Sequence, residues 1–325
     1  MILNGHLLHS YQTCARRHAL ESLYRYLPHH PNTLLSTVLR RAIYDLSQGR
    51  ELHPTTTTAV HTFVSNSKHP GLDLPPGLQP YTLAMDCCAC IRTILEHFHR
   101  TPLPRLCLRP NTPVSDDLEW SYLSFSDQSG SLHRYKFVDS ISDPSVLTEL
   151  HSWEVFGDLA VSSSPMTLHL VSIGRRDGSR RSSPWCRTYR SPAMNTYKFQ
   201  KKSGQSLGES WKPMWFADNP NSDPEVWVDL MEADGILDSL VRTVSVRQPD
   251  PIHVLNFLRD LKSIAAQMQS QSSIRWFEQP MSRPSCDSPY VCPHQSVCYS
   301  TDPEHQIRTC GLYEVRRGLP QTPSV

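Results

Sequence analysis

The spacing of apolar residues predicts helices in the first third of the chain and again towards its end. In residues 33–48 and 82–99, apolar positions recur at i, i+3, i+4 and i+7, the spacing of one buried helix face. Two later helices are predicted to begin at Pro224 and Pro251, because proline is favoured at the first position of a helix. The Thr-, His- and Pro-rich residues 50–80 are predicted to be a connection. The predicted helices cover residues 11–27, 33–48, 82–99, 224–231 and 251–269.

The apolar period changes to two in the middle of the chain, which predicts strands. Residues 127–130 and 162–165 are expected to be turns between them. The predicted strands cover residues 118–126, 133–139, 153–161 and 167–173, with one more at 237–247. Helices, a strand meander, a helix, a strand and a closing helix indicate an α/β class with one mixed sheet (α+β).

Size and charge narrow the choice of function. A chain of 325 residues buries roughly three quarters of its unfolded surface, so it has a true core. The net charge is +1, so only a local patch could attract nucleic acid. Ten cysteines without a signal peptide predict a reducing, cytoplasmic location. No apolar run approaches 18 residues, so no membrane span is expected.

Three cysteines near the C-terminus, Cys286, Cys292 and Cys298, are spaced Cx5C and Cx5C with prolines between them. Prolines prevent a continuous helix, so the thiols are expected on turns that fold around one centre. Three ligands leave a tetrahedral site one short, and Cys14 is the fourth candidate. Ordinary loop cysteines remain an alternative, as does a zinc site completed by Cys310 or His294. The Cys87, Cys88 and Cys90 cluster is expected on a core-facing helix side.

One thiol at the start of an N-terminal helix and three in a C-terminal loop resemble the iron–sulfur branch of the RecB-type PD-(D/E)XK nucleases. That family includes CRISPR-adaptation nucleases and the AddAB helicase–nucleases. The resemblance implies a 4Fe-4S cluster on Cys14, Cys286, Cys292 and Cys298 that joins the two chain ends. The spacing departs from the family, which usually has a two-residue gap where this chain has the first Cx5C.

The same resemblance implies an αβββαβ core with N-terminal helical additions. It divides the chain into a helical region at 1–110, a core at 111–270 with a basic insertion at 175–220, and a cysteine region at 271–325.

The resemblance also implies two acids and a lysine on adjacent strands, which hold Mg²⁺ or Mn²⁺ and activate water. The expected hairpin supplies Glu154 and Asp158 as the best metal ligands. However, Ala160 stands where Gly-x-x-Asp would place its acid, and Ser172-Ile173-Gly174 replaces Asp/Glu-x-Lys. Weak or absent catalysis is therefore expected. The open alternatives are ligands from Asp139 or Glu119, a lysine from Lys198, Lys201 or Lys202, or a structural Asp158 paired with a downstream arginine.

Residues 175–202 contain nine Lys or Arg and one acid, with aromatic residues between them. Basic side chains neutralise phosphates and rings stack on unpaired bases. The segment therefore predicts DNA contact, although a solvated ribbon with inward rings is also possible. The predicted contacts are Arg175, Arg176, Arg180, Arg181, Trp185, Arg187, Tyr189, Arg190, Lys198, Lys201 and Lys202.

The sequence thus favours a nuclease-like DNA-binding protein, either a weak metal-dependent deoxyribonuclease or an inactive relative, with a helicase or other DNA-processing protein as partner. The alternative is a non-catalytic interaction module with structural zinc in a nucleic-acid-processing complex.

Overall fold

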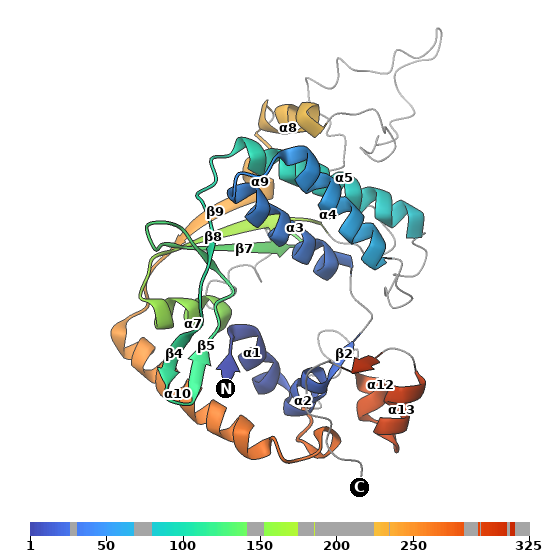
Figure 1. The fold of residues 1–325 in the computed structure, drawn as a ribbon, viewed down its shortest axis with the longest axis vertical. Helices are drawn as coiled ribbons and strands as arrows, with labels where there is room; N and C mark the ends of the chain where they lie inside the picture. Colours follow the sequence, from blue (N-terminus) through green and yellow to red (C-terminus); the bar gives the residue numbers. More distant parts are fainter. Residues whose placement is uncertain are drawn as a thin grey trace.

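The computed structural model describes residues 1–26, 31–67, 80–141, 153–174, 185, 224–233, 235–282, 292, 294–310 and 313–315. The fold is mixed α/β, as expected, and is built on a five-stranded sheet of order β3-β6-β7-β8-β9 (Figure 1). Strands β7 and β8 are parallel, and the other neighbouring pairs are antiparallel. The bounds are β3 Cys107–Leu108, β6 Phe125–Ser126, β7 Leu132–Val138, β8 Met166–Ser172 and β9 Val241–Val246.

Helix α7 (Trp153–Ser162) connects the two parallel strands, so the predicted strand at 153–161 is wrong. Parallel neighbours need a crossover connection, which is usually a helix. Val155 and Leu159, four residues apart, pack on Leu132 of β7 and Met166 of β8. A short apolar run fits a strand or a buried helix equally well, and here the topology decides.

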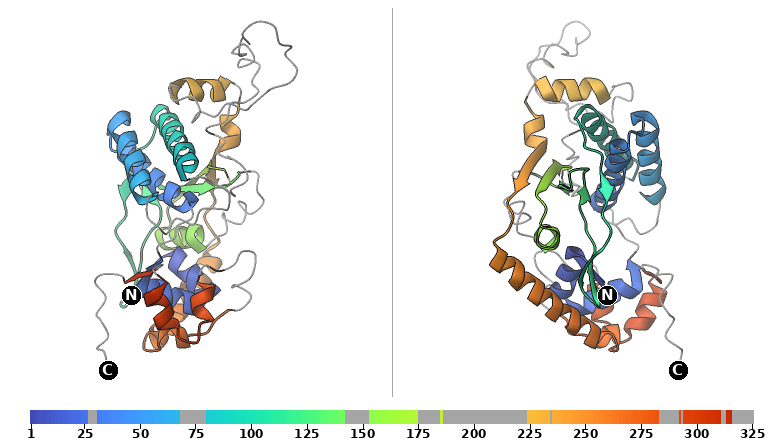
Figure 2. Two further views of the ribbon diagram at one scale, coloured as in Figure 1. Left: turned by 90° about the vertical axis from the view of Figure 1, so that its right-hand side faces the viewer. Right: turned by 60° about the vertical axis from the view of Figure 1, so that its left-hand side comes forward.

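A layer of helices lies on the opposite face of the sheet from α7, as Figure 2 shows for α4 and α5, and α8 packs on α5. They share one core with Tyr135, Phe137 and Val171 of the sheet. Cys87 and Cys90 are fully buried there, which confirms their predicted core role. The helices are α3 (Pro31–Ser47), α4 (Leu52–Ser67), α5 (Pro80–Arg100), α8 (Pro224–Ala233) and α9 (Leu237–Leu240).

Helix α4 overturns the connection predicted for residues 50–80. Its Pro54 lies in the first turn, where a missing N–H costs nothing, and Ala59 and Phe63 are buried against α3 and α5. Tertiary burial thus outweighs the weak helix propensity of its threonines.

A second core lies on the far side of α7. Trp120 and Phe257 pack there against Leu8 and Leu261. The predicted strand 118–126 is split, because its first part joins the N-terminus in a small sheet of order β1-β5-β4. The elements of this core are β1 (Ile2–Leu3), α1 (Gly5–Thr13), β4 (Thr112–Ser115), β5 (Leu118–Trp120) and α10 (Pro251–Gln271).

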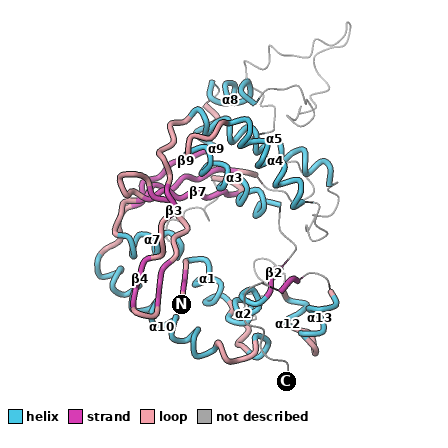
Figure 3. Tube along the Cα trace, viewed as in Figure 1, coloured by secondary structure: helices cyan, strands magenta, loops and turns pink. Residues whose placement is uncertain are grey.

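Helix α10 leads from the main sheet to the C-terminal region, where the N-terminal elements α2 and β2 lie beside α12 and α13 (Figure 3). Leu20 of α2 packs on Trp276, Val297 and Ile307. Strand β10 pairs antiparallel with β2. The elements are α2 (Ala15–Leu23), β2 (Tyr24–Tyr26), the 3-10 helix η3 (Trp276–Glu278), α12 (Gln295–Cys298), α13 (Pro303–Thr309) and β10 (Tyr313–Val315).

The helix predicted at 11–27 is interrupted at Cys14, whose backbone is extended between α1 and α2. Within the described residues, every helix is too short or too polar to cross a bilayer.

Candidate functional site

A cluster of charged side chains lies between β7 and α7. Arg134 of β7 pairs with Glu154, and its second terminal nitrogen is 3.7 Å from Asp158 Oδ2. Lys136 lies on the same face of β7, because side chains alternate along a strand, and its Nζ is 3.8 Å from Glu154 Oε2. The Arg134 guanidinium therefore lies between two carboxylates of one helix.

Asp158 is completely buried and makes structural hydrogen bonds. It accepts from Trp120 Nε1 at 2.9 Å, and from Ser124 N at 3.1 Å and Ser124 Oγ at 2.7 Å. Burial raises the pKa of Asp158 despite the opposing effect of Arg134 and these donors. The side chain was predicted on a strand as a metal ligand, but it belongs to a helix and ties that helix to the segment before β6. The structural alternative fits better, with upstream Arg134 as the partner.

The pKa of Glu154 shifts in the opposite direction from that of Asp158. Burial acts to raise its pKa, but Arg134 and then Lys136 hold the pKa below the usual value, so the carboxylate is ionised. His6 Nδ1 of α1 lies 3.9 Å from Glu154 Oε1. Burial, followed by the positive charge of Arg134, lowers the pKa of Arg40 on α3. Three permanent cations thus surround the ionised Glu154.

This cluster does not form a metal site as it stands. In the part of the chain that is described, no group of three or more His, Cys, Asp or Glu side chains could hold a metal ion. Asp139 Oδ1 accepts from Asn32 and Glu119 Oε2 accepts from Asn111, so these alternative ligands have other partners. The alternative lysines, Lys198, Lys201 and Lys202, lie outside the described residues.

The cysteine region brings the two chain ends together at Cys14. Its Sγ accepts from the backbone N–H of Arg17 at 3.5 Å, at the start of α2. Burial raises the pKa of Cys292, and the charge of the nearby Cys14 raises it further, while Arg17 lowers it. The cysteines Cys14, Cys292 and Cys298 are each exposed by 9% or less. Two of the predicted ligands are therefore neighbours across 278 residues of sequence, whereas Cys286 lies outside the described residues.

Arg16 fixes this junction from the α2 side. Its Nε donates to the Gln279 carbonyl at 3.0 Å, and a terminal nitrogen donates to the Cys298 carbonyl at 3.2 Å. The Arg16 backbone N–H also donates to the Pro280 carbonyl. One side chain thus links the first helices to both flanks of the C-terminal cysteine loop.

His294 and Cys310 are engaged elsewhere. The buried His294 bonds through Nδ1 to the Tyr313 hydroxyl at 2.9 Å and through Nε2 to Glu21 at 3.1 Å. Although burial raises the pKa of Glu21, the bonds from His294 and Arg17 bring that pKa down to about 2. Cys310 Sγ donates to the Ile307 carbonyl. This geometry disfavours either residue as a fourth metal ligand.

Trp185 does not lie where the predicted nucleic-acid track would need it. The side chain is fully buried, its Nε1 donates to the Ser172 carbonyl at 2.7 Å, and its ring lies 5.9 Å from that of His97. The ring is therefore a core residue and is not available to stack on a base, as the inward-packing alternative predicted. The other predicted contacts lie outside the described residues: Arg175, Arg176, Arg180, Arg181, Arg187, Tyr189, Arg190, Lys198, Lys201 and Lys202.

Sequence reasoning missed Arg40, Arg134 and Lys136. The signal was present in the predicted strand 133–139, where two basic residues fall on one face of an otherwise buried segment. A cation on a core strand requires a buried anion.

Compared with known proteins, the chain matches no family model, no curated protein and no solved structure. The geometry of these two regions is therefore the basis for any functional conclusion.

Proposed function

We propose that this chain is a nucleic-acid-binding protein with a PD-(D/E)XK-like core that does not cleave its ligand, and that a four-cysteine iron–sulfur centre joins its two ends. The observation that carries the proposal is the electrostatic interaction between the N-terminal thiol Cys14 and the C-terminal thiol Cys292, with Cys298 buried in the cluster that joins α2 to the C-terminal region.

The order of elements supports the core assignment. Along the chain, α5, β3, β6, β7, α7 and β8 follow one another as αβββαβ, apart from the β4–β5 hairpin. The first three strands form an antiparallel meander, and the helix crosses over to a parallel fourth strand. This order is compatible with the αβββαβ core that the family resemblance implies, and also with other α+β folds.

The charges on β7 support the absence of cleavage. Arg134 stands two residues before Lys136, where an acid-x-Lys pair would place its acid. A divalent ion at such a site binds water and lowers its pKa, which a guanidinium cannot do. Arg134 pairs with both Glu154 and Asp158, and Lys136 supplies a second positive charge beside Glu154, so the two cations balance the two carboxylates. The protein thus keeps the charge balance of a metal site without the metal.

The same cluster supports binding of a phosphate backbone. Lys136, whose side chain is 25% exposed, and the partly buried Arg40 are the cations of this cluster that a phosphate can reach, whereas Arg134 is 5% exposed and paired with the two carboxylates. Local positive charge attracts phosphates and releases their counterions. Binding should accordingly weaken steeply with salt.

Buried cysteine thiolates are the ligands that iron–sulfur centres use, and a helix N-terminal N–H points at Cys14. The described residues do not by themselves bring three such ligands together, so Cys286 is needed to complete the centre. When bound, the centre would supply a cross-link between the ends of the chain. Cys286 would be the fourth ligand.

Metal and sulfide analysis of anaerobically purified protein tests this centre. We expect a brown protein with iron and acid-labile sulfide, both lost in Cys14→Ser. The matched control is Cys107→Ser, an exposed cysteine on β3 that should leave the content unchanged. Iron retained in Cys14→Ser would contradict the proposed ligand set, and stoichiometric zinc without sulfide would favour the zinc-containing interaction module.

A nuclease assay tests the absence of cleavage. Wild-type protein should bind single- or double-stranded DNA and leave both intact with Mn²⁺ at protein excess. The matched control is Lys262→Ala, which changes an exposed lysine on α10. The proposal would be overturned if the wild-type protein cleaved DNA, Lys136→Ala abolished that cleavage and Lys262→Ala preserved it. No binding to either DNA would also overturn it.

A further inference from the structure

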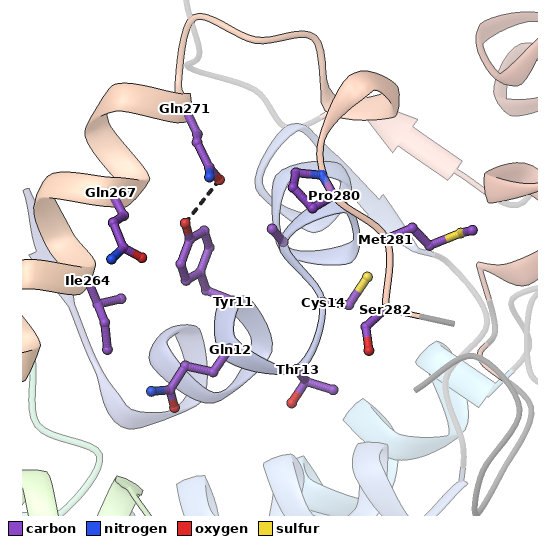
Figure 4. A pocket seen from close by; sticks show the side chains of 11 residues that line it. Tyr11, Gln12, Thr13, Cys14, Ile264, Gln267, Gln271, Pro280, Met281 and Ser282 are labelled. Carbon is purple, nitrogen blue, oxygen red and sulfur yellow. Dashed lines mark hydrogen bonds between the residues drawn. The ribbon is translucent and has the colours of Figure 1, made fainter. Parts of the chain in front are cut away.

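An open cleft of about 580 Å³ lies beside Cys14, between α1 and α10 (Figure 4). Tyr11 and Gln12 contribute from α1, and Gln267 and Gln271 contribute from α10. The C-terminal segment Pro280–Ser282 closes one side. The cleft therefore exists because the two chain ends meet.

The lining is neutral but rich in hydrogen-bonding groups. None of the described residues that line the cleft is Lys, Arg, Asp, Glu or His, so these residues do not offset the desolvation of a charged ligand. The Tyr11 hydroxyl donates to Gln271 Oε1 at 3.0 Å, which holds that amide at the edge of the cleft. The amides of Gln12 and Gln267 make no hydrogen bond within the described residues and are exposed.

Side-chain amides present a donor and an acceptor in one plane, which matches the edge of a nucleobase. Glutamine can bind a base edge in this bidentate way. The cleft volume is within the range of small-molecule sites. Tyr11 and Ile264 add an aromatic ring and an apolar side chain against which a flat heterocycle can pack.

We propose that this cleft binds one unpaired nucleobase of a single-stranded nucleic acid. A duplex is disfavoured because its Watson–Crick edges are paired and its stacked bases cannot enter a cleft one at a time. The inference rests on the proposed nucleic-acid binding and adds to it a preference for single strands. In this arrangement the charged cluster on β7 attracts the backbone, and the glutamine-lined cleft holds a base.

The test compares a short single-stranded oligodeoxynucleotide with an abasic strand of the same length, by fluorescence anisotropy on the full-length protein. The two strands carry the same phosphates, so their difference isolates the base. We expect the base-containing strand to bind about tenfold more tightly. The double variant Gln12→Ala/Gln267→Ala should lose that preference while its affinity for the abasic strand is unchanged. Gln269→Ala, exposed on the same helix, is the matched control and should keep the preference.

Equal affinity for the two strands, or a preference that survives in the double variant, would overturn the cleft assignment while nucleic-acid binding stands. Failure of both strands and of duplex DNA to bind would instead remove the proposed function itself. A blocked diglycine amide tests whether the cleft binds peptide instead. If it competes with the oligonucleotide more strongly than thymidine does, the cleft is a peptide site and the inference is overturned.

Discussion

The buried cation on β7 gives the sharpest prediction about this protein. Arg134→Met keeps most of the side-chain volume but removes the charge between Glu154 and Asp158. The side chains of Arg134 and Asp158 are 5% and 1% exposed, so solvent cannot replace the lost partner. Breaking a buried ion pair by removing one member costs about 3–5 kcal/mol, and we expect a loss of this size in the free energy of unfolding at neutral pH.

The loss should depend on pH. The pKa of Asp158 is raised in the folded protein, so its protonated form contributes stability at low pH that is lost as pH rises through the folded pKa. Arg134 opposes this rise, and its removal raises the pKa further. The destabilisation by Arg134→Met should therefore be smaller at about pH 5 than at about pH 7.5.

Urea denaturation of the folded protein at both pH values measures these differences. Arg308→Met is the matched control, since Arg308 pairs with Glu304 on the surface with the side chains 75% and 46% exposed. Such a pair is worth less than about 1 kcal/mol. Adding Asp158→Asn to Arg134→Met should recover part of the loss, because the unpaired charge is gone. Equal effects of Arg134→Met and Arg308→Met would refute the role assigned to the buried pair.

Three further outcomes follow from the same structure. Gly157→Ala should cost about 1–3 kcal/mol in unfolding free energy, because the added Cβ would lie 2.2 Å from Trp120 Cζ2; no loss in a thermal melt would show that the ring can move aside. Burial lowers the pKa of His169 to about 4, whereas an unfolded histidine protonates near 6.5, so the folded protein loses about 1.4 kcal/mol of stability per pH unit between pH 6.5 and about 4. His169→Phe should remove this pH dependence, which urea denaturation across that range measures. The exposed His99→Phe is the control and should leave the slope unchanged. Arg134→Glu should create an acid-x-Lys pair on β7, so Mn²⁺ should raise the melting temperature of that variant but not of wild type. An equal shift in both proteins would contradict the proposal that Arg134 occupies the position of the missing acid.

Part of the candidate site could be anticipated from the sequence. The separated cysteines predicted that the N-terminal and C-terminal segments meet, and α2 and β2 do pack against the C-terminal region, where Cys14 and Cys292 interact electrostatically. The loss of the acid–lysine motif also indicated weak or absent cleavage, which stays a prediction. The positions of the charges could not be anticipated, because Arg134 and Asp158 are 24 residues apart and face each other only after the α7 crossover forms.

The sequence by itself determined the long amphipathic helices α3, α5 and α10, whose apolar spacing persists over at least four turns and specifies one buried face. It also determined strand β8 and the core role of Cys87 and Cys90.

Only the tertiary structure decided that residues 153–162 are a helix, that Trp185 lies in the core, and that Arg134 pairs with two carboxylates. Short segments have nearly balanced local preferences, so burial and the parallel pairing of β7 with β8 select their conformation. The pairing of buried charges also depends on the tertiary structure, because the free energy of a buried ion depends on the partner that the fold places within a few ångströms.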